Sequence, residues 1–87
     1  MEPTTPFWFK QRQCKLETAG AENTYRVTGP NLGEAFLSIR SVGPDGWQAA
    51  FRRTADGPDV AVSDAELPSV RAAWEAAFEL YRNQMIV

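Results

Sequence analysis

The chain has 87 residues, of which 44% are hydrophobic and 23% are charged, with nine basic residues against eleven acidic ones. This composition is typical of one small globular domain, and the net charge of −2 argues against a general attraction to nucleic acid or to an anionic membrane. The presence of one cysteine and no histidine excludes an intrachain disulfide, the common zinc sites and any catalytic triad that contains histidine.

The N-terminal part of the chain is predicted to form an arm and then a long strand. Residues 1–6 contain two prolines and no periodic pattern, so we expect a flexible arm. Residues 7–18 are predicted to be a strand, because their second half alternates between apolar and polar residues. The strand would begin with three aromatic residues, which would occupy both of its faces: Phe7, Trp8 and Phe9.

The middle of the chain has the period-two alternation of half-buried strands. The alternating segments are residues 24–28, 34–42 and 47–54. The last two are joined by Gly43-Pro44-Asp45-Gly46, which predicts a tight turn with proline at a central position and a positive φ at Gly46. Residues 60–62 fit either a very short strand or an extended lead into a helix.

The C-terminal residues 64–84 have helical periodicity. One apolar stripe recurs at helical spacing and consists of Val70, Ala73, Trp74, Ala77, Phe78 and Tyr81. Ser63 and Glu66 have the spacing of a capping box, whereas Pro68 favours a break, so we expect one turn at 64–67 and the main helix from about residue 68 to residue 83.

These elements predict an α+β fold over a single domain, residues 1–87. The apolar stripe requires a sheet to cover, so we expect an antiparallel three- to four-stranded meander in residues 7–62, with one long C-terminal helix packed across one face. Trp74 and Phe78 should then share a core with three inward-facing strand residues, Leu37, Ile39 and Phe51.

Few residues in the chain could carry out chemistry. Cys14 has the inward phase of its predicted strand and no histidine to lower the pKa of its thiol, so we expect it to be buried and unreactive. The carboxylates of residues 56–66 fit turns and helix capping, and they lack the spacing of a calcium loop. We therefore predict no catalytic residues, no cofactor, no metal and no small-molecule substrate. The acidic N-terminus and the lack of a long apolar run predict a cytoplasmic protein that does not bind membranes.

Two groups of side chains are candidates for binding a partner. Phe7, Trp8 and Phe9 would lie on an edge strand, where exposed aromatic residues favour strand addition or dimerisation, and the apolar residues 85–87 would lie at the other terminus. The alternative is that both ends fold back over the core. A possible basic face opposite the helix would consist of Arg12, Arg26, Arg40 and Arg52. Arginine is also common on a solvated sheet face, where its stem covers apolar surface.

The layout of the strands and the helix resembles two families of DNA-binding domains. With Gly46-Trp47-Gln48-Ala49-Ala50-Phe51-Arg52 in the sheet and Ala73-Trp74-Glu75-Ala76 in the helix, residues 24–82 look like the arm-type DNA-binding domains of phage tyrosine recombinases and the plant ethylene-response DNA-binding domain. The resemblance implies that Arg26, Arg40 and Arg52 would face the major groove. The whole chain is also similar to short uncharacterised bacterial proteins of mobile elements, and this similarity implies no activity.

We therefore expect a non-catalytic small interaction or regulatory protein, which binds another protein or itself through an aromatic edge strand and a sheet face. The alternative is a DNA-binding module that uses the arginine-bearing sheet face, although the net charge disfavours nucleic acid. Strong salt dependence in a duplex-binding assay would favour DNA, and a stable self-complex would favour the protein interaction.

Overall fold

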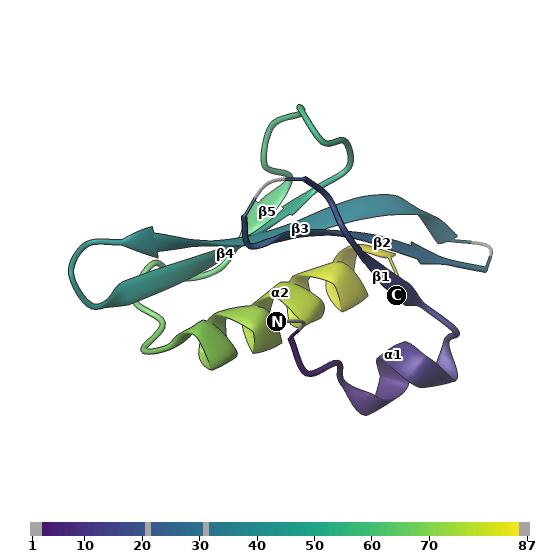
Figure 1. Ribbon diagram of the computed structural model, residues 1–87, viewed down its shortest axis with the longest axis horizontal. Coiled ribbons are helices and arrows are strands. Elements are labelled where there is room, and N and C mark those ends of the chain that lie inside the picture. The colour runs from purple at the N-terminus through teal and green to yellow at the C-terminus, as the bar shows by residue number, and fades with distance from the viewer. Residues whose placement is uncertain (1–2, 21, 31, 86–87) are drawn as a thin grey trace.

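The computed structural model describes residues 3–20, 22–30 and 32–85, which form a five-stranded antiparallel sheet and two helices (Figure 1). The strands neighbour one another in chain order: β1 (Lys15–Thr18), β2 (Thr24–Gly29), β3 (Leu32–Val42), β4 (Gly46–Arg52) and β5 (Ala61–Val62). The helices are α1 (Phe7–Gln11) and α2 (Val70–Met85). The predicted α+β meander with a long C-terminal helix is confirmed, and the described sheet has one strand more than the three or four expected. The predicted apolar tail beyond Met85 lies outside the described residues.

The first half of the predicted strand over residues 7–18 is wrong, because this segment forms α1 and β1 begins only at Lys15. Successive side chains of a strand point to opposite faces, whereas a helix can turn neighbouring aromatic residues toward the same partner. The helix ends in a Schellman motif, in which the Cys14 N–H donates to the Phe9 carbonyl (3.1 Å) and the Gln13 N–H to the Lys10 carbonyl (3.0 Å). Gln13 takes the left-handed conformation that this motif requires, with a φ of 57°.

The predicted hairpin between β3 and β4 is confirmed, but its glycines have other roles than expected. Val42 pairs with Gly46 across the turn, and the positive φ belongs to Gly43 (74°), before the proline. Gly46 is instead a point of close backbone approach. A Cβ at this position would lie 2.8 Å from the carbonyl oxygens of both Val42 and Ala65.

The segment that follows β4 returns along its outer edge. The short-strand alternative for residues 60–62 is confirmed as β5, and further along Leu67 and Trp47 exchange N–H···O bonds of 3.0 and 3.1 Å. The predicted capping box at Ser63 is wrong, because its hydroxyl accepts the N–H of Ala49 in β4 (2.8 Å). The N-terminus of α2 is capped by Ser69 instead, whose hydroxyl accepts the Ala72 N–H at 3.1 Å.

One hydrophobic core lies between α2 and the sheet, as the periodicity predicted. Trp74 and Phe78 share this core with the three predicted strand residues, Leu37, Ile39 and Phe51. The rest of the stripe is also buried except Val70, which is 42% exposed at the start of α2. None of the helices in the described ranges is long and apolar enough to cross a membrane.

Candidate functional site

The face of the sheet opposite α2 carries three of the four predicted arginines. Strand pairing aligns Arg26, Phe36 and Arg52 in one row across β2, β3 and β4, and Arg40 lies further along β3 with the same phase. Phe36 is only 7% exposed although it points away from α2. In Figure 1 the loop between β4 and β5 stands on this side of the sheet, away from α2. We call this surface the arginine face, defined by Arg26, Arg40 and Arg52.

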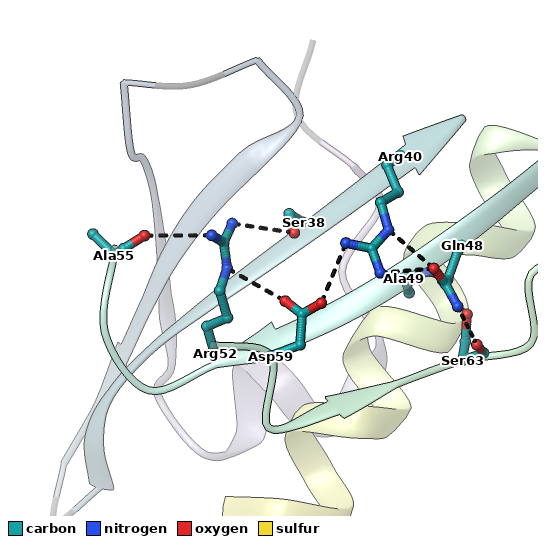
Figure 2. Close-up of polar contacts among 8 residues, drawn as sticks. All are labelled: Ser38, Arg40, Gln48, Ala49, Arg52, Ala55, Asp59 and Ser63. Atoms are coloured by element: carbon teal, nitrogen blue, oxygen red, sulfur yellow. Dashed lines mark hydrogen bonds and ion pairs between the residues drawn. The ribbon is translucent and has the colours of Figure 1, made fainter. Parts of the chain in front are cut away.

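Asp59, at the end of that loop, lies between two of these arginines (Figure 2). One carboxylate oxygen is 3.2 Å from Nη1 of Arg40, and the other is 3.9 Å from Nε of Arg52. Arg40 also donates from Nε and Nη2 to Oε1 of Gln48, at 2.9 and 2.7 Å. Gln48 in turn donates to the Ser63 carbonyl at 3.0 Å, so the arginine face is joined to the segment that borders β4. Asp59 therefore holds the end of the β4–β5 loop to the sheet through charge-assisted contacts.

The third arginine of this face is also paired within the chain. Nε of Arg26 lies 2.9 Å from a carboxylate oxygen of Glu34, and Glu17 lies opposite Arg26 on β1. The partly exposed positions of Arg26 and Glu34 give such a pair a modest value, about 0–1 kcal/mol. Arg12 does not belong to this face, because it caps the C-terminal end of α1. Arg26, Arg40 and Arg52 thus lie on one face of the sheet and Arg12 does not, and a binding role for this face stays a prediction.

The three aromatic candidates for partner contact do not form one exposed edge. Phe9 is 2% exposed and packs edge-to-face on Phe78 of α2, with ring centroids 5.3 Å apart. Trp8 stacks on Tyr81, also in α2, with an interplanar angle of 6°. Phe7 alone of the three is well exposed, at 78%. The alternative in which the N-terminal aromatics fold back over the core therefore holds for two of them.

β1 is one edge of the described sheet and follows the predicted aromatic segment, and the two-residue β5 is the other edge. As the first strand of the described sheet, β1 has β2 as its neighbour in the strand order. The Ala19 N–H donates to the Thr24 carbonyl at 3.2 Å, so the alternation of an antiparallel ladder turns the backbone groups of Lys15 and Glu17 toward β2. The N–H and C=O groups of Leu16 and Thr18 point outward.

Sequence reasoning placed the edge too early and missed the side chains that form it. Two charged residues, Lys15 and Glu17, flank a single apolar one, Leu16, and this pattern is typical of edge strands, which use charge to avoid unwanted pairing. This signal is present in the sequence, next to the aromatic run that predicts an edge at residues 7–9. We call the exposed rim of Lys15–Thr18 the β1 edge.

Cys14 and Tyr81 are neighbours between α1 and the sheet. Cys14 is half-buried and precedes β1, so the expectation of a fully buried strand residue is wrong. Burial raises the pKa of its thiol above the ordinary value. Burial also raises the pKa of the Tyr81 phenol, and the thiol beside it acts in the same direction. The Tyr81 hydroxyl has no hydrogen bond of good geometry to any residue in the described part of the chain.

Among residues 3–20, 22–30 and 32–85, no three histidine, cysteine or acidic side chains gather as a metal site would require.

The resemblance to DNA-binding domains stays a prediction. Comparisons of the chain with protein families, with curated proteins and with solved structures gave no match.

Proposed function

We propose that this protein is a non-catalytic interaction domain that binds an extended polypeptide as an added strand at the β1 edge. The observation that carries the proposal is the row of outward N–H and C=O groups at Leu16 and Thr18. In strand addition such groups provide affinity through main-chain hydrogen bonds, and alternate side chains provide specificity. Leu16 would offer a half-buried apolar contact on the α2 side of the sheet, and Lys15 and Glu17 would offer charges on the arginine face.

The electrostatics of the arginine face favour a protein partner over duplex DNA. Arg40 and Arg52 already face the carboxylate of Asp59, and Arg26 faces Glu34. A phosphate backbone would have to displace these carboxylates and would also meet an acidic chain as a whole. Added strands require no such displacement at the β1 edge. A reducing cytoplasmic location agrees with the single free thiol of Cys14.

The test is selection of displayed peptides on the wild-type protein, with Thr18→Pro as the counter-selection. Proline removes the outward N–H of Thr18 and leaves the β1–β2 ladder intact, because the amide of that residue does not face β2. The matched control is Arg71→Gln, on the exposed surface of α2. We expect peptides that bind the wild type and Arg71→Gln and that lose binding to Thr18→Pro.

Two outcomes would overturn the proposal. One is a selection that yields no peptide, or only peptides that bind Thr18→Pro as well as the wild type. The other is salt-sensitive binding of mixed-sequence duplex that disappears when Arg26, Arg40 and Arg52 are all replaced by glutamine, which would support the DNA-binding alternative.

A further inference from the structure

We infer that the strand which the β1 edge accepts is the β1 edge of a second copy of this chain. This inference rests on the proposed function, because it names the partner of the same edge. Two antiparallel copies would be related by a two-fold axis perpendicular to the sheet, and Leu16 of each copy would lie opposite Leu16 of the other. The two Leu16 residues would exchange N–H···O=C bonds, because their backbone groups point outward from β1.

The charges of the edge select this register. With Leu16 opposite Leu16, Lys15 of each copy lies opposite Glu17 of the other, so the symmetry creates two opposite-charge pairs. Only residues whose N–H and C=O groups point outward can bond to the second copy. The two neighbouring registers therefore differ from this one by a shift of two residues along the strand. One of them sets Lys15 opposite Lys15, and the other sets Glu17 opposite Glu17. Both bring like charges together, which is unfavourable across strands.

The side chains agree with this arrangement on both faces of the sheet. Leu16 pairs with Val27 of β2 in the first copy, so it lies on the core side and would meet its symmetry mate there. Lys15 and Glu17 lie on the arginine face, where Glu17 is opposite Arg26. The pairing would therefore join apolar to apolar surface on one side and basic to acidic groups on the other.

The resulting dimer should be weak because the edge is short. β1 has four residues. An interface of this size belongs to the small, transient class, and we expect a dissociation constant of about 0.1–1 mM. This range allows self-association to be controlled by dilution.

The experiment is sedimentation equilibrium of the full chain from about 10 µM to about 1 mM, with charge-reversal variants. Lys15→Glu and Glu17→Lys each turn both opposite-charge pairs into like-charge pairs, so each variant alone should dimerise about tenfold more weakly than the wild type. An equimolar mixture of the two variants should recover dimers, because every acidic side chain at the interface then meets a basic one. Recovery in the mixture also shows that both variants are folded. Arg71→Glu, on the exposed surface of α2, is the matched control and should dimerise like the wild type.

The outcomes separate this inference from the proposed function. A wild type that stays monomeric up to about 1 mM would overturn the second copy as partner, whereas peptide binding lost in Thr18→Pro would still support the β1 edge as an acceptor. A mixture of the charge variants that associates no better than either variant alone would overturn the inferred register.

Discussion

At the residue scale, the Tyr81 hydroxyl is buried beside the Cys14 thiol and makes no hydrogen bond of good geometry in the described chain. The Tyr81 side chain is fully buried between Phe9, Phe51 and the stacked ring of Trp8. A phenol in such surroundings keeps its proton, because ionisation would place an unpaired charge in the core. The direction of the pKa shift, upward through burial, follows from this environment.

We predict that Tyr81→Phe leaves the free energy of unfolding at pH 7 within about 1 kcal/mol of the wild type, because no hydrogen bond of good geometry is lost. The folded pKa lies above the unfolded value of about 10, so the contribution of Tyr81 is complete below pH 10 and is lost as the pH rises toward the folded pKa. The wild type should lose up to about 1.4 kcal/mol per pH unit above pH 10 through this group.

Urea unfolding of the wild type and Tyr81→Phe at neutral pH and at about pH 10.5 measures both effects. The variant should be less sensitive to alkali. Equal alkaline losses in the two proteins would contradict the assignment of the raised pKa to Tyr81.

At the element scale, the β3–β4 hairpin depends on Gly46 for close backbone approach, whereas Gly43 has the left-handed φ. The bridge between Trp47 and Leu67 brings the returning segment against the start of β4. The Ala65 carbonyl oxygen then lies 2.8 Å from where a Cβ at Gly46 would be, and the Val42 carbonyl oxygen lies equally close on the side of the turn. Both neighbours are backbone atoms, so neither can rotate away.

We predict that Gly46→Ala lowers the free energy of unfolding by about 2 kcal/mol, because the added methyl group must push one of these backbone segments away. Gly33→Ala, also in a strand, is the matched control. Its Cβ would meet only Arg53 Nη2 at 3.6 Å and Met85 Cε at 3.7 Å, which are ordinary contacts with side chains. Urea midpoints that fall equally in both variants would indicate a general strand effect instead of close approach.

At the scale of the whole molecule, α1 completes the core that α2 and the sheet begin. Trp8 and Phe9 of α1 contact Tyr81 and Phe78 of α2, and the C-terminal cap of α1 leads directly into the β1 edge. The position of the β1 edge therefore depends on α1, which packs against α2. Loss of α1 packing should disturb the core and the proposed binding surface together.

We predict that Phe9→Ala lowers the free energy of unfolding by about 3–5 kcal/mol, because it leaves a cavity beside Phe78. Phe7→Ala removes a ring that is mostly exposed and should change the same quantity by no more than about 0.5 kcal/mol. Chemical denaturation of the two variants provides the comparison. Similar losses for both would contradict the asymmetry between the two rings.

The sequence by itself determined the elements in which a regular spacing of apolar residues marks one buried face. The alternation in β2, β3 and β4 placed Arg26, Arg40 and Arg52 on a common side, and the helical stripe of α2 identified the residues that cover the sheet. Each of these patterns repeats over several residues, so it can be recognised without knowing which element packs against it. The short strand β5 has no such repeat, and the sequence left it undecided.

Only the tertiary structure decided the contacts between segments that are distant in the chain. Three adjacent aromatic residues have no period, so α1 follows from the position of α2 beside Phe9 and not from local pattern. Asp59 reaches Arg40 across 19 residues, and Ser63 bonds Ala49 instead of capping a helix. Hydroxyl and carboxylate groups bind whichever partner the fold brings within reach, and sequence spacing does not specify that partner.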